Sequence, residues 1–115
     1  MPTTDVAAHF TGRDPVVRAI YERLVDVANE FGSVSQEPKK TSIHLTRKTA
    51  FAGVATRRDA LILTLKLDTD IRSPRIFKRE QASARRWYLE VKLTDPKQVD
   101  QQLVRWLERA MALSG

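Results

Sequence analysis

The sequence predicts an α+β domain in which an antiparallel sheet of four to five strands is covered on one face by an N-terminal and a C-terminal helix. Apolar residues recur at helical spacing near both ends of the chain, whereas in the middle they alternate with polar residues, as in strands. Short turns between the alternating segments favour antiparallel pairing. Two helices with one apolar stripe each and a sheet with one apolar face pack as a two-layer sandwich.

The first helix is expected over residues 14–31. Asp14 can accept hydrogen bonds from first-turn amides as the N-cap, and Pro15 suits the first helical position because it has no N–H to satisfy. Gly32 can end the helix in a left-handed conformation. The apolar stripe that this helix would bury consists of Val16, Val17, Ile20, Leu24, Val27, Ala28 and Phe31.

Strands are expected where polar and apolar residues alternate. Leu61, Leu63 and Leu65, for example, point to one face and alternate with Ile62, Thr64 and Lys66. Gly53 inside a strand indicates a bulge or a close approach of another group. The expected strands are residues 41–46, 51–55, 60–67 and 87–94, with a less regular candidate at 34–37.

The segment between the last two of these strands can form a short helix over residues 74–86, because Ser73 followed by Pro74 is a helix-start pattern. Its other side, with Ile76, Phe77 and Ala84, would be only moderately apolar, so the pattern alone does not decide whether these residues are helical. A helix here would place four basic residues on one face, namely Arg75, Lys78, Arg79 and Arg86.

A second helix is expected near the C-terminus. Asp95 is the expected cap and Pro96 the first helical residue. Leu103 should lie near the centre of the buried stripe. That stripe consists of Val99, Leu103, Trp106, Leu107, Ala110 and Leu113.

Length and composition predict one domain over residues 11–115, after a flexible N-terminus of residues 1–10. The chain has no cysteine, which excludes disulfides, thiolate catalysis and cysteine zinc sites. We therefore expect a protein of the reducing cytoplasm. No secretory signal is visible, and the apolar runs are too short to span a membrane.

Positive charge is concentrated in the middle of the chain, where residues 39–86 hold 13 Lys or Arg against 4 Asp or Glu. Clustered positive charge attracts polyanions and acidic partners, although it can also serve only as a soluble surface. Arginine outnumbers lysine, which suits phosphate contacts. The candidate polyanion-binding residues are Lys39, Lys40, Arg47, Lys48, Arg57, Arg58, Arg72, Arg75, Lys78, Arg79, Arg85 and Arg86.

The polar face of the expected sheet is a second candidate site. His44 lies on this face, and its neighbours could bind a small anion or polarise a carbonyl. The simpler interpretation is an ordinary cross-strand ladder of polar pairs. The residues concerned are Ser42, His44, Lys66, Tyr88, Glu90 and Lys92.

Glu90 and Lys92 also form an E-x-K pattern on one strand, with Asp70 upstream. Metal-dependent nucleases of the restriction-endonuclease type use such a set, but the pattern arises readily by chance on an amphipathic strand. We assign no catalytic residue, metal ligand or cofactor from the sequence.

The chain resembles a family of small bacterial domains catalogued as a domain of unknown function. The resemblance rests on TGRDP at residues 11–15, KKTSIHL at 39–45, AFAGV at 50–54 and the closing Trp106-Leu107 helix. It implies an α+β domain that occurs alone or behind other domains, some of them nuclease-like. This neighbourhood is an association with nucleic acids and assigns no activity.

The function that these observations favour is a binding module for a polyanion such as nucleic acid, or for an acidic protein, through residues 39–86. The alternative is a small enzyme or small-ligand-binding domain on the polar sheet face around His44, Tyr88, Glu90 and Lys92. A third possibility is a structural domain that forms a homodimer through an exposed sheet edge or face.

Overall fold

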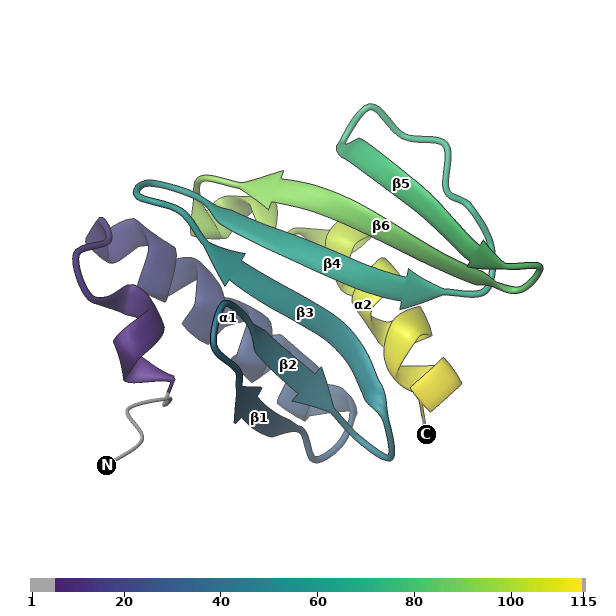
Figure 1. Cartoon of the computed structure of the whole chain (residues 1–115), viewed down its shortest axis with the longest axis horizontal. Coiled ribbons are helices and arrows are strands. Elements are labelled where there is room, and N and C mark those ends of the chain that lie inside the picture. Colours follow the sequence, from purple (N-terminus) through teal and green to yellow (C-terminus); the bar gives the residue numbers. More distant parts are fainter. Residues whose placement is uncertain (1–5, 115) are drawn as a thin grey trace.

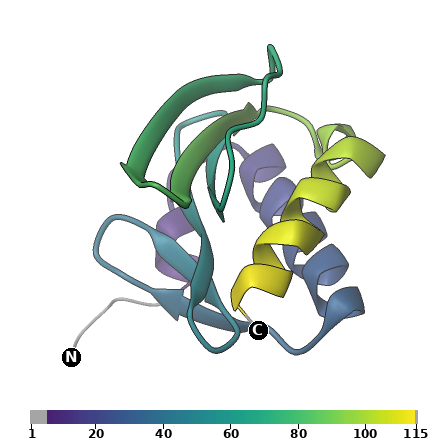
Figure 2. The same ribbon diagram turned by 90° about the vertical axis from the view of Figure 1, so that its right-hand side faces the viewer.

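The computed structural model describes residues 6–114. Six antiparallel strands form one sheet, and two long helices lie against one of its faces (Figure 1). The turned view separates these two layers, with the helices on one side and the curved sheet on the other (Figure 2). The α+β class and the two-layer arrangement are thus confirmed, with six strands in place of the expected four to five.

Helix α1 spans Pro15–Phe31, as the cap pattern predicts. The Asp14 carboxylate accepts a hydrogen bond from the Val16 N–H at 2.9 Å. The Asp14 N–H in turn donates to the Arg58 carbonyl at 2.7 Å, which attaches the start of the helix to a turn of the sheet. Gly32 does end the helix, but with φ 155° and ψ 171°, an extended conformation that favours glycine and not the left-handed one expected.

The part of the expected flexible N-terminus that the structure describes is packed against the domain. Ala7–Phe10 form a short 3₁₀ helix, η1, and Phe10 is buried with its ring 5.2 Å from that of Tyr21. The Thr56 hydroxyl donates to the His9 carbonyl at 2.7 Å. Residues 1–5 lie outside the described residues.

The strands run in the order β1-β2-β3-β4-β6-β5 across the sheet, so β4 pairs directly with β6 and β5 lies outside them as an edge strand. All five segments in which strands were expected form strands. The bounds are Ser35–Pro38 (β1), Ile43–Thr46 (β2), Ala50–Thr56 (β3), Leu61–Leu67 (β4), Ile76–Ser83 (β5) and Arg86–Leu93 (β6).

Strand β5 corrects the idea of a helix over residues 74–86. Only Ile76 of this strand is buried, because the helices do not cover the sheet edge where β5 lies. The strand therefore shows no clear alternation of apolar and polar residues. The expected basic face does not form either: Lys78 lies opposite Glu90, whereas Arg79 lies opposite the core residue Leu89 and on the other side of the strand.

The C-terminal helix is divided in two. Asp95 caps only a 3₁₀ turn, η2, at Pro96–Gln98, and α2 then spans Gln101–Ser114. A second aspartate begins α2, since the Asp100 carboxylate accepts a hydrogen bond from the Leu103 N–H at 3.0 Å. Leu113, which was placed in the buried stripe, is 51% exposed.

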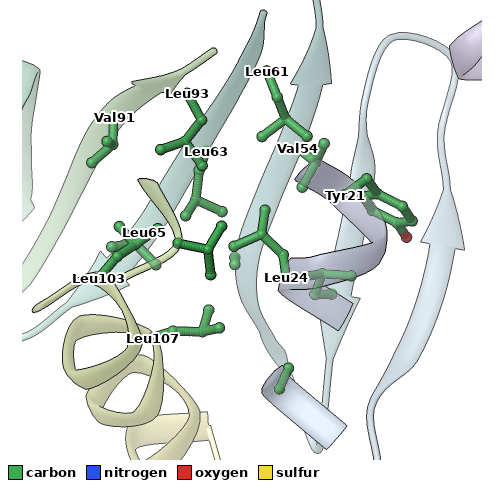
Figure 3. Packing of buried hydrophobic residues seen from close by; sticks show 14 of the residues in the cluster. Tyr21, Leu24, Val54, Leu61, Leu63, Leu65, Val91, Leu93, Leu103 and Leu107 are labelled. Atoms are coloured by element: carbon green, nitrogen blue, oxygen red, sulfur yellow. The ribbon is translucent and has the colours of Figure 1, made fainter. Parts of the chain in front are cut away.

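The core lies between the helices and one face of the sheet (Figure 3). Leu24 of α1 and Leu103 and Leu107 of α2 are fully buried against Leu63 and Leu65 of β4. Burial of such side chains is the main stabilising contribution to the fold. None of the helices formed by residues 6–114 is long and apolar enough to cross a membrane.

Strand β3 has a bulge at Phe51, two residues before Gly53. Leu45 pairs with Ala52 but Thr46 pairs with Ala50, so Phe51 is the extra residue. Phe51 and Ala52 are consequently both buried. Gly53 lies outside this bulge. Because it has no side chain, it leaves a gap between its cross-strand partners His44 and Thr64.

Candidate functional site

The face of the sheet opposite the helices, here called the open face, contains the polar residues of the central strands. One row of cross-strand partners crosses the sheet at Gly53. Gly53 pairs with His44 on one side and with Thr64 on the other. Beyond Thr64 the row contains Glu90 and then Lys78. Lys66 pairs with Tyr88 in a neighbouring row, and Ile62 pairs with Lys92 in another. Strand alternation thus places the predicted polar-face residues of β2, β4 and β6 together.

A hollow of about 320 Å³ lies at the centre of the open face, and we call it the Gly53 hollow. Its floor is the backbone of β3, where Gly53 leaves room that a side chain would fill. A Cβ atom at Gly53 would meet only His44 Cδ2 and Thr64 Cβ, each at 4.0 Å. The side chains that line the hollow include Ser42, His44, Thr64, Lys66 and Tyr88.

A wider groove of about 1020 Å³ adjoins it toward the β3–β4 turn, and we call it the Phe77 groove. Phe77 is 56% exposed, and it occupies the bulge in β5 between Ile76 and Lys78. The groove is also lined by Ile62 and by charged side chains of both signs, with more cations than carboxylates. These charged residues are Arg57, Arg58, Asp59, Arg75, Lys78, Glu90 and Lys92.

His44 is neutral near pH 7. Burial lowers its pKa below the ordinary value of 6.5, and the positive charges of Lys66 and Lys39 lower it further, against the opposing effect of Glu37. A neutral imidazole has one N–H donor and one acceptor nitrogen. His44 can therefore both donate and accept a hydrogen bond in the hollow.

Lys66 is held above its cross-strand partner. Its Nζ lies 5.8 Å from the centroid of the Tyr88 ring, within the range of a cation–π contact. No ion pair among the described residues involves Lys66. Glu90, by contrast, forms an ion pair of 3.7 Å with Lys78. The hollow thus has a cation without an ion pair, while the two carboxylates in its row, Glu90 and Glu37, are already paired with Lys78 and Lys39.

The twelve candidate polyanion-binding residues do not form one patch. The β1–β2 and β3–β4 turns place Lys39, Lys40, Arg57 and Arg58 at one end of the sheet. The β2–β3 and β5–β6 turns place Arg47, Lys48, Arg85 and Arg86 at the opposite end. The remaining four, Arg72, Arg75, Lys78 and Arg79, lie in the β4–β5 loop and in β5.

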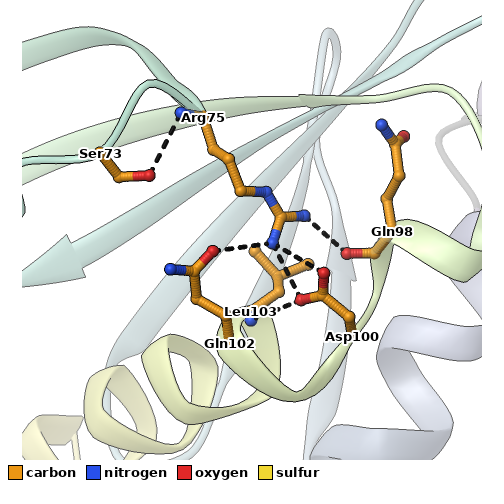
Figure 4. A network of polar contacts seen from close by, with 6 residues as sticks. All are labelled: Ser73, Arg75, Gln98, Asp100, Gln102 and Leu103. Carbon is orange, nitrogen blue, oxygen red and sulfur yellow. Dashed lines mark hydrogen bonds and ion pairs between the residues drawn. The ribbon is translucent and has the colours of Figure 1, made fainter.

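Arg75 is committed to a structural network (Figure 4). Its Nη1 donates to the Asp100 carboxylate at 2.8 Å and to Gln102 Oε1 at 3.2 Å, and its Nη2 donates to the Gln98 carbonyl at 2.7 Å. The guanidinium also lies 5.8 Å from the centroid of the Trp106 ring. Arg75 therefore connects β5 to α2, and it also lines one end of the Phe77 groove.

Several other candidates are also engaged within the chain. Arg79 donates to Asp70 at 3.0 Å and to the Ile71 carbonyl at 3.0 Å, and Arg72 lies 3.3 Å from Asp70. Lys39 lies 3.7 Å from Glu37. Among residues 6–114, no ion pair involves the following exposed cations: Lys40, Arg47, Lys48, Arg57, Arg58, Arg85, Arg86 and Lys92.

The residues of the E-x-K pattern do not form a metal site in the described part of the chain. Asp70 is bound by Arg79 and Arg72, whereas Glu90 is paired with Lys78. Within residues 6–114, no three His, Asp or Glu side chains gather closely enough to hold a metal ion.

The comparison with protein families identifies the family of this chain. The family described as Domain of unknown function (DUF5655) matches residues 6–114, which is nearly the whole chain. The chain belongs to this family. No curated protein and no solved structure matches the chain. The description of the DUF5655 family names no activity, so the chemistry of this DUF5655 domain has to be argued from its own open face.

Two features of that face were missed by sequence reasoning. Phe77 was placed on the apolar side of a helix, whereas it lines the groove beside Lys92. Gly53 was noted as a break in a strand, but its importance as the floor of a hollow follows only from its neighbours across the sheet. The available signal was a glycine on the same face as His44 and Thr64.

Proposed function

We propose that this DUF5655 domain binds single-stranded nucleic acid across the open face of its sheet. The observation that supports this best is the combination of aromatic and cationic side chains on a face that no helix covers. Tyr88 and Phe77 line the two adjoining hollows. Lys66 and Lys92 lie beside them, and Arg57 and Arg58 border the groove.

This combination suits an unpaired strand better than a duplex. Unstacked bases can stack on exposed aromatic rings, which contributes about 1–3 kcal/mol per base, while cations contact the phosphates. A base in a duplex is already stacked and presents only its edge. Phe77, with more than half of its surface exposed, is the side chain most accessible to such a base.

The proposed surface keeps the preference for a polyanion but changes the residues that bind it. Arg75 and Arg79 are held by Asp100 and Asp70, so a phosphate would have to replace existing partners. Arg58 and Lys92 are exposed and form no ion pair among the described residues. They are the better phosphate contacts.

Fluorescence anisotropy with labelled oligonucleotides of about 12 nucleotides, single- and double-stranded, DNA and RNA, tests the proposal. We expect single strands to bind more tightly than duplexes, with affinity falling log-linearly between about 50 mM and about 200 mM salt. The variant Arg57→Glu/Arg58→Glu/Lys92→Glu, at three exposed cations that line the Phe77 groove, should lose at least about tenfold in affinity, since each reversal removes one phosphate contact. Phe77→Ala should weaken binding about fivefold to a hundredfold through lost stacking.

The matched control is Arg23→Glu/Lys97→Glu/Arg105→Glu, which makes the same change in net charge on the helix side of the molecule. These three residues are exposed and enter no ion pair among residues 6–114. If both triple variants lose affinity equally, only net charge matters and the proposed surface is wrong. Absence of binding at low salt would also refute it.

Light scattering on the same samples separates nucleic-acid binding from self-association. A monomer that binds single strands agrees with the proposal. A dimer that is lost on Phe77→Ala, together with no oligonucleotide binding, would assign the open face to a second copy and overturn the proposal.

A small-ligand function at the same face is favoured by one specific observation, the size of the Gly53 hollow. Its volume of about 320 Å³ is at the lower end of the range of ligand pockets. A thermal-shift assay with nucleoside monophosphates tests this. Stabilisation by a mononucleotide without any binding of longer strands would favour the small-ligand function.

A further inference from the structure

The floor of the Gly53 hollow has no side chain. The two cross-strand neighbours of Gly53, His44 and Thr64, stand on either side of it. Each would be in van der Waals contact, at 4.0 Å, with a Cβ atom at Gly53, so these two side chains border the hollow closely. The hollow above them has a volume of about 320 Å³, which is enough for one nucleobase.

The walls of the hollow offer more donors than acceptors. The Lys66 ammonium group can only donate hydrogen bonds, and the hydroxyl groups of Ser42, Thr64 and Tyr88 can donate or accept. Neutral His44 offers one of each. The backbone N–H and C=O groups of β3 at the floor are used in pairing with β2 and β4.

Among residues 6–114, no carboxylate lines the hollow. Two carboxylates stand in its row: Glu90 is opposite Thr64 and is engaged by Lys78 at 3.7 Å, and Glu37 is opposite His44 and is engaged by Lys39 at 3.7 Å. Lys66 is positioned at the rim by its contact with the Tyr88 ring. A ligand edge that meets Lys66 must therefore present an acceptor.

Nucleobases differ at the edge that faces the major groove in a duplex, and this is the edge that would meet Lys66. Guanine, thymine and uracil present a keto oxygen, which accepts hydrogen bonds, whereas adenine and cytosine present an exocyclic amino group, which donates them. An amino group facing a lysine would leave both donors without a partner, at a cost in free energy. The donor-only lysine thus discriminates between two classes of base.

We propose that the Gly53 hollow holds one nucleobase of the bound strand and selects keto bases over amino bases, with Lys66 as the residue that determines this preference. This inference rests on the proposed function, and it names the class of base that the open face recognises. Ser42, His44 and Thr64 contact the remaining edges of the base.

The test compares labelled oligo(dT) with oligo(dC) of equal length by fluorescence anisotropy. Both are pyrimidine strands, so stacking and phosphate contacts are closely matched. We expect oligo(dT) to bind on the order of tenfold more tightly. Lys66→Gln should remove this ratio, because an amide can accept as well as donate and so satisfies either base.

Gly53→Val fills the floor of the hollow with a residue suited to a strand, and it should also reduce the ratio to near one. Ala82→Val, on the exposed edge strand β5 and outside the hollow, is the matched control and should keep it. Because each ratio is taken within one variant, changes in net charge cancel. Circular dichroism verifies that each variant is folded. If Gly53→Val does not fold, the affinity ratio measured for Lys66→Gln tests the proposal.

The outcomes separate the two proposals. Equal binding of oligo(dT) and oligo(dC) by the unaltered protein would overturn base selection and leave single-strand binding standing. A preference that survives Lys66→Gln would assign it to other residues and refute the role of the hollow. If neither oligonucleotide binds, the proposed function itself fails.

Discussion

At the scale of single residues, Arg75 shows how a cation can be structural. Arg75 lies directly before β5. Its guanidinium donates hydrogen bonds to Gln98 of η2, to Asp100 directly before α2 and to Gln102 of α2. Arg75→Ala should lower the free energy of unfolding by about 1–3 kcal/mol, because it leaves these partners without their donor. Urea denaturation measures this. Arg72→Ala, at a side chain that is 87% exposed, is the control and should change stability little.

Arg75→Ala should weaken oligonucleotide binding less than Arg58→Glu does, because the Arg75 guanidinium lines the Phe77 groove but is already engaged by Asp100 and Gln98. A variant that stays fully stable but loses binding would contradict the structural role assigned to Arg75.

Asp100 gives the domain a specific acid sensitivity. The hydrogen bond from the Leu103 N–H holds the pKa of this carboxyl below its ordinary value of 3.8; burial opposes this effect, and the hydrogen bond and charge of the Arg75 guanidinium add to the lowering. A lowered pKa stabilises the fold above the ordinary value, and this stabilisation is lost as pH falls through the folded-state pKa. Asp100→Asn should therefore show a weaker decline in the free energy of unfolding between about pH 5 and about pH 3.

Urea denaturation at several pH values tests this, with the unaltered protein as the reference. The other carboxyl groups titrate in both proteins, so the informative quantity is the difference between the two curves. Parallel curves over the whole range would show that Asp100 is not the group responsible.

At the scale of elements, α2 contains a matched pair of leucines. Leu103 is fully buried and Leu113 is 51% exposed. Leu103→Ala should lower the free energy of unfolding by about 2–5 kcal/mol through lost burial and a cavity. Leu113→Ala should change it by less than about 0.5 kcal/mol. Chemical denaturation of both variants measures the difference, and similar losses would contradict the orientation of α2.

How far each element could be predicted depends on what covers it. Helix α1 and the strands β3, β4 and β6 are packed on the core, so burial gave them a clear apolar period. β5 has no layer over it, and its lysine, arginine, glutamate and glutamine are compatible with a helix. Ser73 and Pro74 then resembled a helix start. The tertiary position at the sheet edge decided the outcome.

The candidate site divides in the same way. Alternation alone indicated that His44, Lys66 and Tyr88 share a face, since each strand is half buried. The hollow depends on register across β2, β3 and β4, which places Gly53 between His44 and Thr64. No local pattern encodes that register. Phe77 reached the groove through a bulge, which shifts one strand relative to its neighbour.

At the scale of the whole molecule, the helices close one face of the sheet and leave the other available (Figure 2). The antiparallel turns then distribute the basic residues to the two ends of the sheet instead of to one patch. The net charge of +6 was evident from composition, but its arrangement was not. Cations at both ends of an open face suit an extended anion that crosses the sheet.

The exposed edge strand has a further consequence, for how this protein behaves at high concentration. Within residues 6–114, no strand pairs with the outer side of β5. The N–H and C=O groups of such an edge can recruit another chain and start a fibre. Lys78, Arg79 and Glu80 place charges along it, which opposes that growth. Replacing these three by neutral β-formers would turn the edge into a seed for aggregation, and charge on β5 is therefore a safeguard of solubility.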